Sequence, residues 1–254
     1  MSGWFLQQGY GVRFEWGAAG ARRLAPEVAC LVVIDVLSFT TSVSVAVDAG
    51  TRVLPYPWRD GTAAAFARER DAELAGGRRA VSPDRPWSLS PAALRKAPFT
   101  PRLVLPSPNG SAIAAAAGTG VVVAGCLRNA TAVGRWLAAH GYGTADRPLA
   151  VIAAGEHWPG EDGLRPALED LLGAGAVISA LHTLGARPLS PEAEAARTAF
   201  TGTPDPAAAL ADCSSGLELI RGGFAEDVAI AAEPDASGCV PVLTDGAFAD
   251  AARP

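Results

Sequence analysis

An acidic residue at the end of an apolar run is the first position that could do chemistry. Asp35 follows the run 31–34 and precedes the hydroxyl residues Ser38, Thr40 and Thr41. A short β-branched run bounded by polar residues predicts a buried parallel strand, and open α/β sheets bind ligands at the carboxyl ends of such strands. The segment therefore predicts a metal or phosphate site, with one alternative left open: Asp35 caps the next helix or binds amides of the turn.

A second polar turn follows the apolar run 102–105. It reads Ser107-Pro108-Asn109-Gly110-Ser111 and leads into an Ala-rich helix. Asn-Gly suits a tight turn, and the free amides at a helix start suit an anion. The pattern predicts a phosphate cradle, with a plain capped strand–helix turn as the alternative.

Two further strand ends carry polar residues. Arg128 and Asn129 follow the run 121–124, where they could bind an anion, or act as a solvated side chain and a helix cap. After the run 149–153 the chain is rich in charge and reaches the adjacent pair Glu169 and Asp170. Neighbouring helix residues point about 100° apart, so we expect one of these carboxylates to face the pocket of Asp35 and the other to bind nearby backbone.

Apolar runs alternate with helix-length segments along the whole chain. The predicted strands are 12–16, 30–36, 52–55, 102–105, 121–124 and 149–153, and the predicted helices are 41–49, 61–74, 110–117, 130–140 and 165–181. A helix at 215–222, a strand at 227–231 and an extended piece at 240–243 complete the C-terminal unit. This alternation predicts an α/β fold, a layered α/β/α arrangement with a largely parallel sheet, in a single domain over 1–254 that could comprise two closely packed lobes. The Pro-rich stretches 76–101 and 201–212 are expected to be irregular.

Composition narrows the class of protein. The chain has 254 residues and a formal net charge of −5, which argues against a general nucleic-acid binder. The N-terminus lacks the pattern of a signal peptide and no apolar stretch is long enough to span a bilayer, so a cytoplasmic protein with no membrane contact is expected. The cysteines at 30, 126, 213 and 239 are far apart, which predicts buried, reduced thiols rather than a zinc site. The P-loop, G-x-S-x-G and H-E-x-x-H motifs are absent from the sequence.

Taken together and in this order, the polar motifs resemble those of the 2-phosphosulfolactate phosphatase family of Mg²⁺-dependent phosphatases. The matching segments are residues 33–41, 107–111, 125–130, 153–155 with 167–170, and 213–216 through 223–228 to 240–241. The resemblance implies hydrolysis of the phosphate ester of a sulfonated hydroxy acid, a layered α/β fold and pocket residues Asp35, Asn109, Asn129, Glu169 and Asp170. Ser38 stands where that family usually has Arg, and Gly76-Gly77-Arg78-Arg79 stands where it usually has a Gly-Glu motif.

We therefore predict a Mg²⁺-dependent phosphatase acting on a small phosphorylated organic acid, 2-phosphosulfolactate or a related phospho-hydroxy acid. Asp35, Asn109 and Asp170 are the predicted catalytic residues, and Asp35 and Glu169 the predicted metal ligands; Asp35 could also be the nucleophile or the base. The predicted substrate-binding residues are Ser38, Thr40, Thr41, Ser107, Gly110, Ser111, Arg128 and Asn129. A non-catalytic protein that binds a phosphate ester or another small anion on the same scaffold is the alternative. A homodimer is one assembly that such a chain could form.

Overall fold

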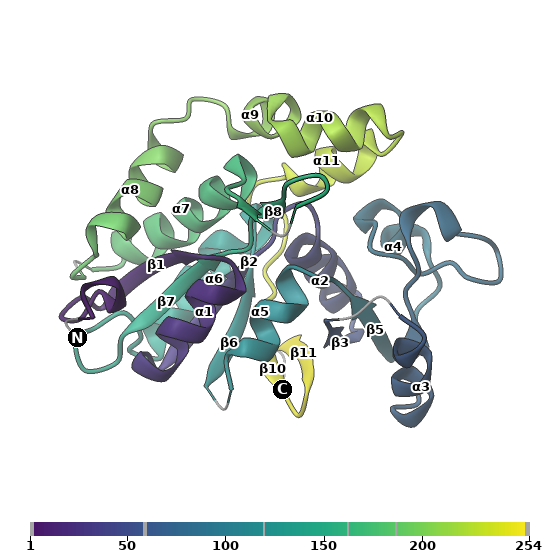
Figure 1. Cartoon of the computed structure of the whole chain (residues 1–254), viewed down its shortest axis with the longest axis horizontal. Coiled ribbons are helices and arrows are strands. Elements are labelled where there is room, and N and C mark those ends of the chain that lie inside the picture. Colours follow the sequence, from purple (N-terminus) through teal and green to yellow (C-terminus); the bar gives the residue numbers. More distant parts are fainter. Residues whose placement is uncertain (1–2, 58–59, 119, 162, 186, 252–254) are drawn as a thin grey trace.

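A nine-stranded sheet with helices on both faces organises the chain (Figure 1). The computed structural model describes residues 3–57, 60–118, 120–161, 163–185 and 187–251. Seven of the nine strands belong to two parallel blocks, so the predicted layered α/β fold with a largely parallel sheet is confirmed.

The elements alternate between strand and helix through most of the chain. The strands are β1 (Val12–Trp16), β2 (Cys30–Ile34), β3 (Arg52–Tyr56), β4 (Glu73–Leu74), β5 (Arg102–Pro106), β6 (Val121–Gly125), β7 (Leu149–Ala153), β8 (Glu156–His157), β9 (Leu164–Arg165), β10 (Pro241–Thr244) and β11 (Ala247–Asp250). The helices are α1 (Gly17–Leu24), α2 (Phe39–Asp48), α3 (Thr62–Glu69), α4 (Pro91–Lys96), α5 (Gly110–Ala116), α6 (Ala130–Ala139), α7 (Leu168–Thr183), α8 (Pro191–Thr201), α9 (Pro206–Asp212), α10 (Ser214–Arg221) and α11 (Ala225–Ala231).

The first parallel block has the order β1-β7-β2-β6 and contains the strand that ends at Asp35. Side chains of β2 alternate between two cores because successive residues of a strand point to opposite faces. Leu31 and Val33 pack with α1, α2 and α5, whereas Val32 and Ile34 pack with α6 and α7. Every residue of β2 is buried, which explains the uninterrupted apolar run in the sequence.

The second parallel block, β3-β5-β4, joins the first through the C-terminal hairpin β10–β11. β10 lies antiparallel to β6, with Val242 opposite Val123. β11 lies antiparallel to β3, with Phe248 opposite Val53. The last strands of the chain therefore lie in the middle of the sheet.

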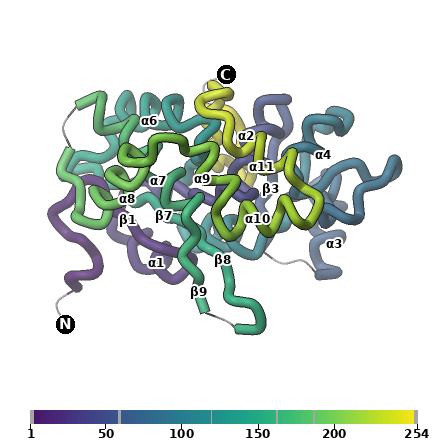
Figure 2. Tube along the Cα trace, turned by 90° about the horizontal axis from the view of Figure 1, so that it is seen from above, coloured from purple at the N-terminus to yellow at the C-terminus, as the bar shows by residue number. Residues whose placement is uncertain are grey.

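Three short helices, α9, α10 and α11, form a layer at the top of the molecule in Figure 1. The view from above in Figure 2 shows α10 and α11 beside one another, with β8 close to α10. The prediction of a strand at 227–231 was wrong, because these residues belong to α11. The Pro-containing stretch 201–212 likewise contains a helix, α9, whose N-cap Asp205 accepts a hydrogen bond from the amide of Ala208.

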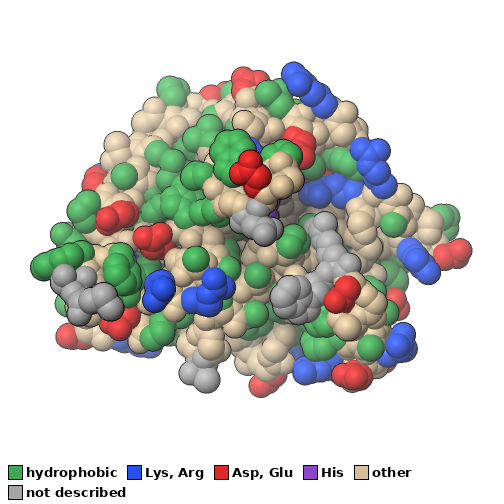
Figure 3. All heavy atoms as spheres, viewed as in Figure 1, with side chains coloured by type: hydrophobic (Ala, Val, Ile, Leu, Met, Phe, Trp, Pro, Cys, Tyr) green, Lys and Arg blue, Asp and Glu red, His purple; other side chains and the backbone are tan. Residues whose placement is uncertain are grey.

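Acidic and basic side chains are interspersed over the face of the molecule shown in Figure 3, in keeping with the small net charge of −5. Within the described residues, none of the helices combines the length and apolar character needed to cross a membrane.

Candidate active site

A cavity of about 270 Å³ lies where the carboxyl ends of β2 and β5 approach the hairpin β8–β9 and helix α10. Its lining includes polar side chains from five separate segments: Asp35, Ser38, Arg78, Ser107, Asn109, Glu156 and Ser215. The carboxyl edge of a sheet with parallel strands is where α/β proteins generally bind ligands.

Asp35 is held in place by backbone amides on both sides of its carboxylate. Its Oδ1 accepts a hydrogen bond from the amide of Phe39 (3.0 Å), and its Oδ2 accepts one from the amide of Gly110 (2.8 Å). Burial raises the pKa of Asp35, the two amides lower it, the charge of Glu169 raises it and that of Arg78 lowers it. Asp35 is therefore a fixed, buried carboxylate on the cavity wall. It also binds backbone amides of the turn and of the next helix, which was the alternative role considered for it.

Glu156, which the sequence did not nominate, brings a second carboxylate into the cavity. It lies on β8, just after the carboxyl end of β7, and its Oε2 accepts a hydrogen bond from Nδ2 of Asn109 (3.1 Å). Burial, together with the charges of Asp35 and Glu169, raises the pKa of Glu156 to about 7, although the hydrogen bond from Asn109 and the charge of Arg165 lower it. The same strand-end rule that selects Asp35 could have selected Glu156, because the strand that it follows, β7, neighbours β2 in the sheet.

Asp170 binds backbone rather than the cavity. Its Oδ1 accepts the amide of Val36 (2.7 Å) and its Oδ2 accepts the amide of Gly155 (2.8 Å). It thereby ties together the turns that follow β2 and β7. Burial raises the pKa of Asp170 well above its ordinary range, and the charges of Glu169 and Asp35 add to that rise. Asp170 was predicted to be catalytic. In the structure it holds the two turns in position and does not line the cavity.

Glu169 is buried beside the same cluster of acids. Its Oε2 accepts a weak hydrogen bond from Sγ of Cys213 (3.3 Å), the residue that caps α10. The side chain of Glu169 is close enough to raise the pKa of both Asp35 and Glu156 by its charge, yet it is not among the residues that line the cavity.

Two of the predicted substrate-binding hydroxyls hold the turn after β2. Thr40 Oγ1 donates to the carbonyl oxygen of Asp35 (2.9 Å), and Thr41 Oγ1 donates to that of Val36 (2.7 Å). Both threonines are fully buried and neither lines the cavity. Their hydroxyls are therefore used to shape the backbone around Asp35.

The turn between β5 and α5 contributes differently from what its sequence suggests. Ser107 lines the cavity, with its Oγ 3.5 Å from Oδ2 of Asp35. Ser111 is buried and donates to the carbonyl oxygen of Leu105 (3.2 Å). The Gly110 amide, predicted to face a phosphate, is occupied by Asp35. An added Cβ at Gly110 would lie 2.3 Å from a ring carbon of Phe39, so only glycine allows this close approach.

Arg78 enters the cavity from the loop before α4. Its Nη2 donates to Oγ of Ser38 (2.6 Å), and its Nε donates to Oδ2 of the buried Asp227 (2.8 Å). Ser38, predicted to bind substrate, therefore lines the cavity. The guanidinium group of Arg78 beside it was not predicted from the sequence.

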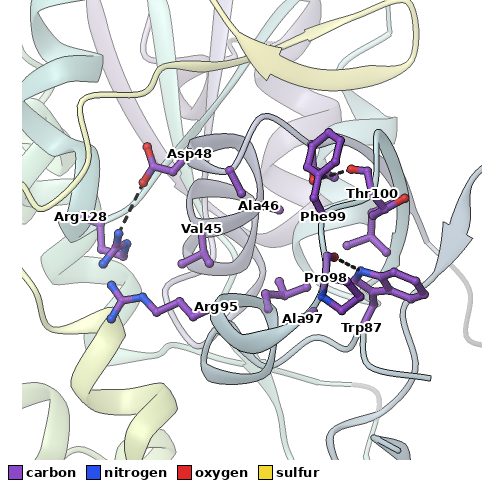
Figure 4. A pocket seen from close by; sticks show the side chains of 14 residues that line it. Val45, Ala46, Asp48, Trp87, Arg95, Ala97, Pro98, Phe99, Thr100 and Arg128 are labelled. Carbon is purple, nitrogen blue, oxygen red and sulfur yellow. Dashed lines mark hydrogen bonds and ion pairs between the residues drawn. The ribbon is translucent and has the colours of Figure 1, made fainter. Parts of the chain in front are cut away.

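Arg128 and Asn129 lie outside this cavity, so the structure does not bring them together with Asp35. Asn129 Oδ1 accepts the amide of Cys126 (2.9 Å), and its Nδ2 donates to backbone carbonyls of residues 124 and 239. Arg128 is buried and pairs with Asp48 and Glu233. It borders a separate cavity of about 400 Å³ along α2, where Figure 4 shows it across from Trp87 and Phe99. Asn129 thus has partners for both ends of its amide, and Arg128 has two carboxylate partners, although its Nε is buried without a hydrogen-bond partner in the described part of the chain.

The oxygen donors of the cavity beside Asp35 suit a hard cation. Asp35 and Glu156 line this cavity together with the exposed Glu218, and Arg78 is the one positively charged side chain in its lining as described. A phosphate brought beside Asp35 and Glu156 would be repelled unless a cation intervened. Mg²⁺ takes one or two carboxylates and completes its shell with water and phosphate oxygens. No group of three or more His, Cys, Asp or Glu side chains in the described part of the chain forms a ready-made metal cage. The oxygen donors that are present fit Mg²⁺ bound jointly with a phosphate.

Comparison with known proteins finds a matching family and curated relatives that cover most of the chain. The family model described as 2-phosphosulpholactate phosphatase matches residues 21–246. A protein of Deinococcus radiodurans named "Probable 2-phosphosulfolactate phosphatase" is 34% identical over 227 residues, covering 87% of this chain and 89% of the relative. A protein of Thermus thermophilus with the same name is 31% identical over 217 residues, covering 84% of this chain and 87% of the relative.

Proposed function

Because the chain belongs to the 2-phosphosulpholactate phosphatase family and is thereby a phosphoric monoester hydrolase, we propose that it hydrolyses 2-phosphosulfolactate or a closely related phospho-hydroxy acid in the cavity beside Asp35. The products are the free hydroxy acid and inorganic phosphate.

The observation that carries this proposal is the meeting of Asp35, Asn109 and Glu156 in one small cavity at the carboxyl edge of the sheet. A volume of about 270 Å³ suits a small organic acid. Asp35 is rigidly oriented by two amides, and Glu156 is oriented by Asn109. Such fixed groups favour a reaction because they do not have to reorganise in the transition state.

We assign the binding of Mg²⁺ to Asp35, with phosphate oxygens and water completing the coordination. When bound, the cation would neutralise charge that develops on the phosphoryl oxygens. Glu169, predicted as the second metal ligand, does not line the cavity, so we assign it a different role. It contributes negative charge beside Asp35, because its charge acts on that carboxyl. Asp170 keeps the turns after β2 and β7 in register through Val36 and Gly155.

Glu156 is the group we assign to proton transfer. Its carboxylate faces the cavity, and a pKa of about 7 suits a residue that takes a proton from an attacking water near neutral pH. Asn109, by donating to Oε2, leaves the other oxygen of Glu156 for that water. General-base catalysis of this kind contributes roughly 10²–10⁴-fold to rate.

The proposal is tested by measuring phosphate release from 2-phosphosulfolactate and a panel of other phosphate monoesters, with Mg²⁺ and with EDTA. We expect turnover that EDTA abolishes and that Asp35→Asn lowers by at least about 10²-fold. Asp84→Asn is the matched control, because Asp84 is exposed and outside the cavity.

Activity that survives both EDTA and Asp35→Asn would refute the assignment of Asp35. A stable acyl-phosphate trapped on Asp35 would show that this carboxylate is the nucleophile. Absence of turnover together with calorimetric binding of the phosphate ester would favour a non-catalytic anion-binding protein.

A further inference from the structure

The guanidinium of Arg78 is held in the cavity by two hydrogen bonds, and one of its nitrogen donors has no partner in the described protein. Asp227, which is 1% exposed, accepts from Nε and also from the amide of Ala92 (3.2 Å), so it anchors Arg78 to α4. Nη2 donates to Ser38, and Nη1 has no hydrogen-bond partner among the residues that the structure describes. The side chain of Arg78 is 17% exposed, which leaves it accessible from the cavity.

A hydroxyl on α10 is also left without a partner. Ser215 is 5% exposed and lines the same cavity, and its Oγ is buried with no hydrogen-bond partner in the described part of the chain. Burying a hydroxyl without a hydrogen bond costs free energy, so such a group usually binds a ligand or an ordered water. Ser215 lies in the first turn of α10, where the positive end of the helix dipole favours a negative ligand.

We propose that Arg78, Ser38 and Ser215 form a subsite for a second oxyanion, a carboxylate or sulfonate, carried by the same molecule as the phosphate. This inference rests on the proposed function and names the residues that would recognise the second acidic group of the substrate. The phosphate occupies the side of the cavity lined by Asp35, Asn109 and Glu156, and the second oxyanion binds the groups that the phosphate chemistry leaves free.

The charges around the subsite are consistent with an oxyanion of modest charge. Asp227 offsets the charge of Arg78, so recognition depends on the directed N–H and O–H donors more than on net charge. Glu218 also lines the cavity, but it is exposed, so water screens its repulsion of an anion. The planar guanidinium fork matches both a carboxylate and a sulfonate.

The test compares three phosphate monoesters on the full-length enzyme with Mg²⁺. Ethyl phosphate has no second anion, phosphoglycolate adds a carboxylate, and 2-(phosphonooxy)ethanesulfonate adds a sulfonate. The measured quantity is the preference for each ester with a second anionic group over ethyl phosphate, expressed as a ratio of kcat/KM. We expect the wild type to prefer at least one of them by about tenfold or more, the difference made by a hydrogen bond to a charged group.

Ser215→Ala is the decisive variant, because it removes only a hydroxyl that has no partner in the described protein and so leaves the fold intact. We expect it to lower the preference about tenfold, and Arg78→Lys, which keeps the charge but loses the fork, to lower it at least as much. Ser214→Ala is the matched control, because Ser214 is exposed on the same turn and does not line the cavity.

The outcomes separate this inference from the proposed function. A Ser215→Ala variant with an unchanged preference would overturn the subsite. If the wild type turns over none of the three esters or 2-phosphosulfolactate, the proposed function fails, and calorimetric titration with phosphoglycolate then decides the subsite alone. Weaker binding to Ser215→Ala than to Ser214→Ala would support it, and equal binding would reject it.

Discussion

Replacing Gly110 by alanine tests how tightly the site depends on one close approach. An ideal Cβ at this position would lie 2.3 Å from Cδ1 of Phe39 and 2.8 Å from Oδ2 of Asp35. Carbon atoms in contact prefer about 3.5–4.0 Å, so the overlap with the ring exceeds about 1 Å. Phe39 cannot yield easily, because it is fully buried and packs edge-on against Phe248 at 6.2 Å.

The magnitude follows from that overlap. Overpacking of this kind costs about 1–3 kcal/mol, while a domain of ordinary stability has about 5–15 kcal/mol, so Gly110→Ala stays folded. The start of α5 must instead move away from Asp35 and weaken the hydrogen bond from the Gly110 amide. A displacement of about 1 Å at a catalytic group can reduce turnover by about 10²-fold.

Urea denaturation and steady-state kinetics on one preparation measure both effects. We expect a lower denaturation midpoint and a loss of kcat far greater than the unfolded fraction explains. Gly61→Ala is the control, because no described residue has an atom within 4 Å of a Cβ at Gly61, apart from the immediate chain neighbours, and its φ is −62°. Wild-type kcat and midpoint in Gly110→Ala would refute the close approach and the role given to this amide.

Further predictions concern stability and titration. Asp170→Ala should lower the free energy of unfolding by about 2 kcal/mol, because it leaves two buried amides without an acceptor; an unchanged urea midpoint would contradict this. Burial raises the pKa of Cys30 and of Cys239 to about 12, so both thiols should stay protonated at pH 8. We expect both to resist Ellman's reagent until urea unfolds the protein. Rapid labelling of the native protein would argue against their burial. The pKa of Glu156 is raised to about 7, so the folded protein favours the protonated form of this side chain. The resulting contribution to the free energy of unfolding is fully present below about pH 4.3 and is lost as the pH rises through 7. In EDTA, Glu156→Gln should therefore gain thermal stability relative to wild type between pH 5 and 8, and a constant difference in Tm would show that Glu156 does not titrate there.

Short buried strands are the part of this fold that the sequence predicts well. The strand predicted at 12–16 is β1, and that predicted at 149–153 is β7. Both are apolar on at least one face and are soon followed by a glycine, Gly17 after β1 and Gly155 after β7, so hydrophobicity and turn signals agree. The predicted strand at 227–231 failed because a short run such as Val-Ala-Ile-Ala has no period long enough to separate strand from helix, and the acidic residues Glu226 and Asp227 in the first turn favour a helix.

Side-chain roles at the site were harder to predict than the positions of the strand ends. Thr40 and Asp170 were nominated by residue type, but type alone does not tell whether a hydroxyl or carboxylate will face a cavity or a backbone group. Glu156 sits on a two-residue strand, too short to leave a periodic signal.

Arg78 could not have been placed from sequence, because it reaches Ser38 from 40 residues away through the tertiary fold. The structure brings the guanidinium of Arg78 to the hydroxyl of Ser38, the position at which the resemblance to the family implies an arginine. A cationic group can thus be present at the same spot although a different part of the chain supplies it.

The central position of β10 and β11 also has a consequence for protein synthesis. The first parallel block ends at the open edge of β6, and the second ends at the open edge of β3, until residues 241–250 fill the space between them. On the ribosome these residues emerge after the other strands of this sheet, so both edges stay unpaired while residues 1–240 are already made. Unpaired strand edges invite association with other chains. A nascent chain that stalls or stops shortly before residue 241 is therefore a species prone to aggregation, even though it already carries every residue assigned to the cavity.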